Sequence, residues 1–211
     1  MEFGAADLPD WAPVALAQAG EIGRPALTTL LALDTRLERI VHGATEPILA
    51  QVRMAWWREE IGRHRPDGAN LPPDPLLSAI LAHWGEQRTG LLALIEGWEN
   101  LVGEPPWSSE SHAAFCNGRA LAFSAYAELM GERRLSEAAS LHGAVWGAAN
   151  LAQVDGGYDG RLQSLPRLPR RLRALAVIGG LSWRAVKRGG QPLLGDRMSP
   201  LVALRLGILG V

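Results

Sequence analysis

The stretch RPALTTLLALDTRLERIVHGATEPILAQVRMAWWREEIGR, residues 24–63, decides the fold of this chain. On a 3.6-residue wheel its first half separates an apolar sector from a polar one. The apolar sector holds Leu27, Leu30, Leu31, Leu37 and Val41, and the opposite sector holds Thr28, Thr29, Arg36 and Arg39. Asp34 and Glu38 also fall in the apolar sector. Since an ionised carboxylate facing a core is costly unless it is paired, each needs a cation, a hydrogen-bond donor or a metal ion.

Helical spacing continues through nearly the whole chain, whereas no comparable strand pattern occurs. Helix-starting signals stand before three of the apolar runs, at Thr45-Glu46-Pro47, Asp74-Pro75 and Ser108-Ser109-Glu110. We predict helices over residues 25–42, 46–63, 75–101, 109–130, 135–153, 169–188 and 199–208. The helix over 75–101 is expected to bury one stripe, made of Leu76, Ile80, Trp84, Leu91, Leu94 and Trp98. Trp56 and Trp57 are adjacent, so one of them is expected in the core and the other against a neighbouring helix or a groove.

The composition predicts one soluble domain. A chain of 211 residues with 47% hydrophobic content can bury a substantial core, so we expect a single domain over residues 1–211, with 1–23 as an N-terminal extension. The net charge of -1 excludes no class of partner. However, from Gly160 to Gly195 there are eight Arg or Lys residues and no Asp or Glu. Such a stretch usually forms a solvated helix face, and the alternative is a peripheral contact with an anionic membrane through residues 170–188.

The cysteine content and the chain ends predict a cytoplasmic protein. Cys116 is the only cysteine, so the chain forms no internal disulfide and has no thiolate cluster for zinc. Its neighbours predict a helix in which it is a small core residue. We find no signal-peptide pattern and no membrane-spanning run. Nucleic-acid binding is not expected either, because the basic third of the chain has no recognisable reading motif.

Acidic side chains in the first two helices form the first candidate site. Asp34, Glu38 and His42 lie at i, i+4 and i+8, and Glu59 is expected to project toward the apolar side of the next helix. Stacked carboxylates at this spacing can hold Mg²⁺, which prefers oxygen ligands. The alternative, which the spacing alone favours, is a buried salt-bridge network in which Asp34 or Glu38 pairs with Arg53 or protonated His42.

Asp155 and Asp159, followed by Arg161, form a second candidate site. In a helix, this spacing would suit a metal-diphosphate clamp. Gly156 and Gly157 favour a turn instead, because glycine costs roughly 1 kcal/mol per helix position relative to alanine. In a turn, both aspartates are ordinary polar loop residues.

These segments resemble a known family. The run EPILAQVRMAWWREEI, residues 46–61, resembles a segment of the squalene/phytoene synthase-like proteins, and TLLALDTRLERIVHG, residues 29–43, resembles the helix with their first aspartate-rich motif. The closing SPLVALRLGIL, residues 199–209, is similar to their terminal helix. The resemblance covers most of the chain and is weak between Gly62 and Ser108. It implies an all-α, single-domain isoprenoid-synthase-like helical bundle. Members of the family join two prenyl diphosphates head to head, using Mg²⁺ held by two aspartate-rich motifs.

Both motifs are altered in this chain. Glu38 and His42 stand where the family has DxxxD in its first motif, and residues 155–166 follow the order of its second motif with a Gly-Gly insertion. The resemblance implies Mg²⁺ as the cofactor if the protein is active. The implied catalytic residues are Glu38, Asp155 and Asp159; the implied metal ligands are Asp34, Glu38, Asp155 and Asp159; the implied substrate-binding residues are Arg53, Trp56 and Arg161.

The Glu-Pro and Trp-Trp-Arg version of the segment looks most like the branch that includes mitochondrial complex I assembly factors, which lack the full metal motifs. We therefore expect a non-catalytic protein, a pseudoenzyme, that binds lipid or isoprenoid or acts in protein-complex assembly. The alternative is an active Mg²⁺-dependent prenyltransferase that condenses prenyl diphosphates. The expected partners are a prenyl diphosphate or lipid, a protein of the assembled complex, and a membrane surface.

Overall fold

The computed structural model describes residues 8–64, 74–155, 164–190, 192–194 and 199–209, and these residues form an all-α bundle. The long helices are α2 (Gly23–Gly43), α3 (Pro47–Gly62), α5 (Arg88–Glu99), α6 (Ser109–Leu129), α7 (Ser136–Asp155) and α8 (Arg173–Lys187). Shorter helices are α1 (Ala12–Leu16), α4 (Pro75–Trp84) and α9 (Ser199–Leu209). No strand occurs in this part of the chain. The predicted all-α class is therefore confirmed.

The helix starts follow local chemistry. The Asp74 carboxylate accepts hydrogen bonds from the backbone N–H groups of Leu76 and Leu77, at 2.9 and 3.0 Å, and so caps α4. The Ser108 hydroxyl accepts a bond from the Ser111 N–H at 3.0 Å and caps α6. Pro47 stands at the first position of α3, where its missing N–H costs nothing. All three predicted starts are confirmed.

The predicted helix over residues 75–101 is wrong in one respect, since the chain breaks at its middle. Gly85 has a φ of 49°, a left-handed conformation that favours glycine, and a short 3-10 turn, Gly85–Gln87, separates α4 from α5. Nevertheless, the apolar stripe is buried as predicted, from Leu76 to Trp98. The helix α1 was not predicted, because its five residues lie in the segment expected to be an extension.

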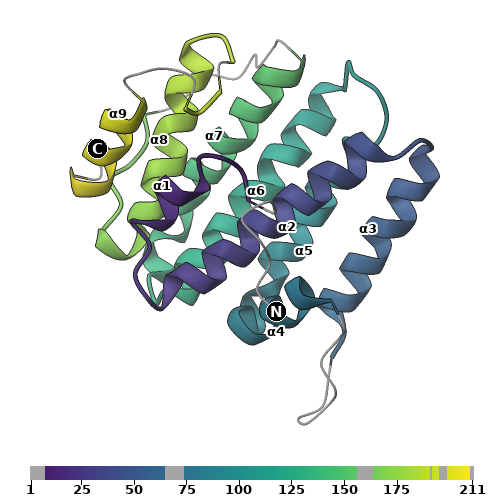
Figure 1. Cartoon of the computed structure of the whole chain (residues 1–211), viewed down its shortest axis with the longest axis horizontal. Coiled ribbons are helices and arrows are strands. Elements are labelled where there is room, and N and C mark those ends of the chain that lie inside the picture. Colours follow the sequence, from purple (N-terminus) through teal and green to yellow (C-terminus); the bar gives the residue numbers. More distant parts are fainter. Residues whose placement is uncertain (1–7, 65–73, 156–163, 191, 195–198, 210–211) are drawn as a thin grey trace.

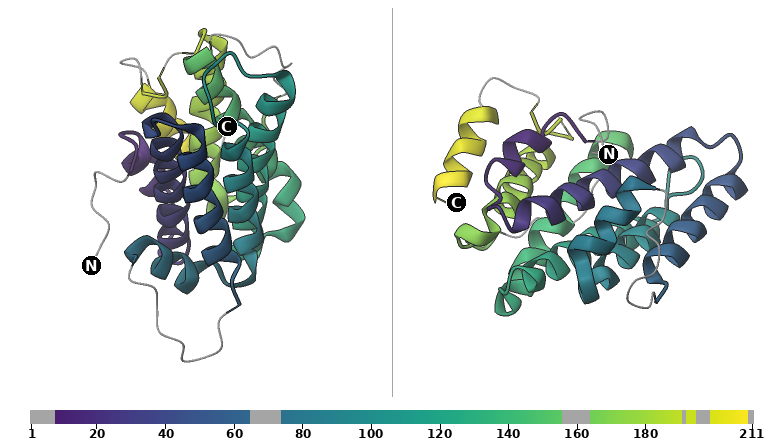
Figure 2. Two further views of the ribbon diagram at one scale, coloured as in Figure 1. Left: turned by 90° about the vertical axis from the view of Figure 1, so that its right-hand side faces the viewer. Right: turned by 60° about the horizontal axis from the view of Figure 1, so that its bottom comes forward.

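Helices α5 to α8 pack side by side in chain order, with α2 in front of them and α3 and α9 at opposite ends of the molecule (Figure 1). Viewed from the side, the long helices run in a common direction (Figure 2). Small residues allow this close packing: a Cβ at Gly143 in α7 would collide with the backbone oxygen of Arg119 in α6, and one at Gly179 in α8 with the ring of His142. Several large aromatic side chains are buried in the core between these helices.

Helix α2 is buried on more than the predicted side. Thr29 was expected on the polar face, but it is 1% exposed. The indole Nε1 of Trp84 donates to its hydroxyl at 2.8 Å, because α4 packs against this face of α2. The neighbouring prediction for the two adjacent tryptophans is confirmed: Trp57 is buried, whereas Trp56 is 44% exposed. Cys116 is also buried on α6, as predicted.

Within the described residues, no helix is both long enough and apolar enough to cross a membrane.

Candidate functional site

Asp34 lies in the middle of α2 and faces the bundle interior, with 7% of its side chain exposed. Its oxygen Oδ1 accepts hydrogen bonds from Trp98 Nε1 at 2.9 Å and from Arg119 Nε at 3.0 Å. The second oxygen, Oδ2, accepts from Arg119 Nη2 at 2.7 Å. A carboxylate has about four acceptor positions, so these three donors occupy most of them. Asp34 is therefore a paired, buried anion.

Arg119 comes from α6 and is itself 1% exposed. Its guanidinium carbon lies 4.1 Å from the centre of the Trp146 ring and 4.5 Å from that of Phe115. Its Nη1 donates to the backbone oxygen of Trp146 at 3.3 Å. The aromatic faces attract the cation, and the bidentate bonds to Asp34 fix its orientation. The pair is thus enclosed by α2, α5, α6 and α7.

The prediction of a buried ion pair is confirmed for Asp34, but its partner was not foreseen. The predicted cations were Arg53 and His42, and the structure places Arg119 there. A sequence signal for it exists, because Arg119 shares a helical stripe with Phe115 and Tyr126, at i−4 and i+7. When one helix carries an arginine on its apolar stripe and another helix carries a carboxylate on its own apolar stripe, the two side chains are candidates for a buried ion pair.

Glu38 lies one turn beyond Asp34 and lines a cavity of about 540 Å³ with Asp34 and Arg119. Polar groups of α7, Asn150 and Gln153, line the other side. Burial raises the pKa of the Glu38 carboxyl above its ordinary value, and the negative charge of Asp34 adds to this rise. Arg119, His42 and the Asn150 hydrogen bond act in the opposite direction. Glu38 is thus a half-buried carboxyl of this cavity whose charged form is disfavoured by its surroundings.

His42 and Glu59, the other two residues of the first candidate site, do not lie in this cavity. His42 is exposed, with its ring 6.3 Å from that of Trp98 in an edge-on contact. The prediction that Glu59 projects toward the core is wrong: its side chain is 71% exposed and pairs with Arg63 at 2.7 Å. The four predicted groups therefore do not converge, since only Asp34 and Glu38 share a cavity.

Arg53 and Trp56, the predicted substrate-binding residues of α3, line a different hollow of about 480 Å³ together with Arg36 and Ile40. This hollow lies between α2 and α3 on the surface, and it shares no lining residue with the cavity of Glu38. The structure thus separates Arg53 and Trp56 from the carboxylates with which they were predicted to act.

The second candidate site lies largely outside the described residues. Asp155 is the last residue of α7, and its side chain is not described; Asp159 and Arg161 lie outside the described residues. Among the residues that are described, no three His, Cys, Asp or Glu side chains are grouped so as to hold a metal ion. A metal site in which Asp155 and Asp159 take part stays a prediction.

No family model, no curated protein and no solved structure matches this chain. The family resemblance of residues 29–61 therefore stays a prediction.

Proposed function

We propose that this protein is a squalene/phytoene synthase-like helical domain of the isoprenoid-synthase type that does not condense prenyl diphosphates and acts as a binding or assembly protein. The observation that carries the proposal is the pairing of Asp34 with Arg119, at 2.7 and 3.0 Å. Asp34, the buried carboxylate one turn before Glu38 of the altered first motif, is already neutralised by Arg119 within the bundle.

This pairing disfavours Mg²⁺ at Asp34 for a physical reason. Mg²⁺ requires near-ideal octahedral oxygen ligands, and most acceptor positions of the Asp34 carboxylate are taken. A divalent cation bound to the remaining position would also lie close to a buried guanidinium, where the low dielectric strengthens repulsion. Glu38 is then the one described acid on α2 left to bind a metal, and burial, which raises its pKa, makes its charged, metal-binding form more costly to hold.

The surface of α3 supports a binding role. Four large apolar side chains on this edge helix are exposed by 44% to 61%, and they are Ile48, Leu49, Val52 and Trp56. The opposite face of α3 is buried against the bundle. A contiguous exposed apolar patch is uncommon on a protein that functions alone and usually marks an interaction site. Arg53 lies in the same hollow as Trp56, so the patch has a basic edge.

The experiment is a turnover assay with two matched variants. We expect purified protein incubated with geranylgeranyl diphosphate or farnesyl diphosphate and Mg²⁺ to release no diphosphate above a heat-denatured control. The enzymatic alternative predicts release that is lost in Asp155→Asn and kept in Glu104→Gln, an exposed carboxylate outside the candidate site. Release with that pattern would overturn the proposal.

A second measurement tests the binding role directly. Protein purified from its native host is extracted with organic solvent, and its bound proteins and lipids are identified by mass spectrometry. We expect a partner or lipid that is lost in the Val52→Glu variant and retained in Leu121→Glu, a change at an exposed apolar residue on α6. Identical recovery from both variants, or recovery of nothing, would contradict a binding role of the α3 surface.

A further inference from the structure

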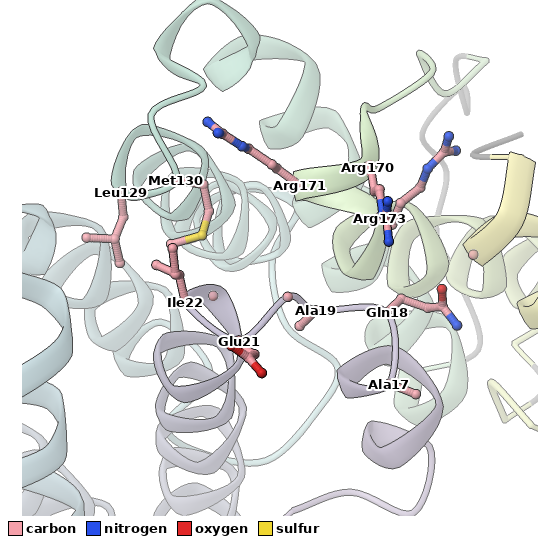
Figure 3. A pocket seen from close by; sticks show the side chains of 13 residues that line it. Ala17, Gln18, Ala19, Glu21, Ile22, Leu129, Met130, Arg170, Arg171 and Arg173 are labelled. Atoms are coloured by element: carbon pink, nitrogen blue, oxygen red, sulfur yellow. The ribbon is translucent and has the colours of Figure 1, made fainter.

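Three arginines line a pocket of about 790 Å³ that belongs to neither candidate site. The pocket lies where the segment between α1 and α2 meets the end of α6 and the start of α8. Arg170, Arg171 and Arg173 lie on one side of it, with their guanidinium groups spread apart, and Glu21 and Ile22 lie on the other (Figure 3). Glu21 is the one acidic residue that lines it. The pocket therefore has an excess of positive charge.

The carboxylates of the bundle do little to neutralise these arginines. Arg171 approaches Glu132 only to 4.0 Å, and 71% of its side chain is exposed. Atom Nη1 of Arg173 is buried and has no hydrogen-bond partner within the described part of the chain. A buried guanidinium N–H without an acceptor is costly, and an anionic oxygen in the pocket would remove that cost.

Exposed apolar side chains flank the same pocket. Ile22, on its rim, is 87% exposed. Helix α9 contributes Gly207 to the pocket and carries an outward stripe of Leu201, Leu204 and Ile208, each exposed by 54% to 64%. These three lie at i, i+3 and i+7, so they form one face of the helix. The opposite face of α9 packs on α8, as shown by the buried Ala203.

We propose that this end of the molecule docks on an anionic phospholipid bilayer, with Arg170, Arg171 and Arg173 attracting lipid phosphates while Ile22 and the outward face of α9 enter the interface. An anionic bilayer surface supplies both negative charge and an apolar layer directly beneath it, which matches this arrangement of side chains. A dissolved phosphate would satisfy the arginines alone. The proposal uses no residue of the Asp34 cavity and stands independently of the proposed function.

This surface differs from the basic helix that the sequence suggested. Most of α8 from Ala174 to Ser182 is buried in the bundle, so the helix cannot lie flat on a membrane. Its later cations also have partners inside the protein: Lys187 lies 3.7 Å from the Trp183 ring centre, and Arg184 donates to Ser199 at 3.2 Å. The basic residues directed to a bilayer are therefore those that precede α8 or form its first turn.

The test is co-sedimentation of the full chain with vesicles. We expect binding to vesicles of equal parts phosphatidylserine and phosphatidylcholine, and none to phosphatidylcholine alone. One basic residue near an anionic surface strengthens binding roughly fivefold, so Arg170→Gln/Arg171→Gln should weaken it about twenty-five-fold. The matched control Arg58→Gln/Arg63→Gln removes the same charge from the C-terminal end of α3, at the other end of the molecule, and should bind as the wild type does. Equal weakening in both variants, or no binding to anionic vesicles, would overturn the proposal.

A second measurement tests the apolar contact and separates a bilayer from free phosphate. An environment-sensitive dye on Leu204→Cys should shift to the blue on anionic vesicles, whereas the same dye on Leu121→Cys should not. Native Cys116 does not compete for the dye, because burial raises the pKa of its thiol to about 11. A shift produced equally by inorganic phosphate without vesicles, or equal shifts at both positions, would contradict a membrane contact.

Discussion

The guanidinium of Arg119 binds both oxygens of the Asp34 carboxylate, through Nε at 3.0 Å and Nη2 at 2.7 Å, although 85 residues separate them in the chain. Both groups are almost fully buried. A buried pair of this kind is costly to break, because removal of one member leaves the other as an uncompensated charge. The pair therefore fixes how α2 is placed against α6, and with it the position of Glu38.

We predict that the hydrogen bond from Trp98 to Asp34 is stronger than a comparable neutral one. Trp98→Phe removes a donor to a carboxylate, and Trp84→Phe removes a donor to the Thr29 hydroxyl. Hydrogen bonds to charged groups contribute about 1.5–3 kcal/mol and neutral ones about 0.5–1.5 kcal/mol. Since both variants lose the same volume from buried sites, Trp98→Phe should lower the free energy of unfolding by about 1 kcal/mol more. Equal losses in urea titrations would argue against an ionised Asp34.

Glu38→Gln is expected to stabilise the protein at neutral pH. Because burial raises the Glu38 pKa in the folded state, the folded protein binds this proton more readily than the unfolded chain does. The charged carboxylate therefore lowers stability above its folded pKa, and this effect disappears as the pH falls below the ordinary value of 4.5. The urea midpoint of the variant should exceed that of the wild type at pH 7, with the difference shrinking toward pH 4. A variant that is less stable at pH 7 would show that Glu38 is held as a favourable anion.

His142 should make the protein less stable in mild acid. Its Nε2 donates to the Pro166 oxygen at 2.9 Å, and its buried Nδ1 has no partner among the described residues. Burial lowers the His142 pKa, so the unfolded chain takes up this proton more readily below the ordinary value of 6.5. Stability should fall as the pH drops from 6.5, and His142→Gln, which keeps a donor for Pro166, should reduce that slope. If stability falls equally steeply with pH in the wild type and in His142→Gln, His142 is not the source of the acid sensitivity.

Close packing of α6 on α7 should make Gly143→Ala strongly destabilising. The new Cβ would collide with the backbone oxygen of Arg119, which a rotamer change cannot move. Overpacking of this kind costs about 1–3 kcal/mol. Gly43→Ala at the end of α2 is the matched control, because a Cβ there meets nothing within 4 Å. The control should be neutral or stabilised by up to about 1 kcal/mol, as expected for alanine in a helix. Similar thermal unfolding temperatures for Gly143→Ala and Gly43→Ala would contradict the close packing of α6 on α7 at Gly143.

The sequence predicts local structure well because helix starts depend on neighbouring residues. Asp74 and Ser108 cap their helices with their own side chains, so the signal and the structure lie within four residues of each other. The 3.6-residue pattern of α2 likewise predicts that Asp34 faces the core. The same pattern does not predict its partner, because the meeting of Arg119 with Asp34 depends on how distant helices pack.

The position of a polar side chain on the surface is harder to predict, because helical periodicity does not show which face of a helix packs against the bundle. Glu59 was assigned to the apolar side of α3 that faces the core, yet α3 has apolar side chains on two faces, and Glu59 lies on the exposed one, at i+7 from Val52. Likewise, the basic third of the chain was treated as one helix face. Only the fold reveals that Arg170 and Arg171 gather at a pocket while α8 itself is buried.

The most direct test of the central claim is a double-mutant cycle on Asp34 and Arg119, measured by urea unfolding with and without Mg²⁺. We predict that Asp34→Leu and Arg119→Met each cost about 3–5 kcal/mol, and that the double variant recovers at least half of the summed loss, because it buries no unpaired charge. Arg53→Met, at an exposed helical position, should cost no more than about 0.5 kcal/mol. Mg²⁺ should leave the wild type unchanged. Additive losses in the cycle, together with stabilisation of the wild type by Mg²⁺, would contradict the claim that Arg119 balances Asp34.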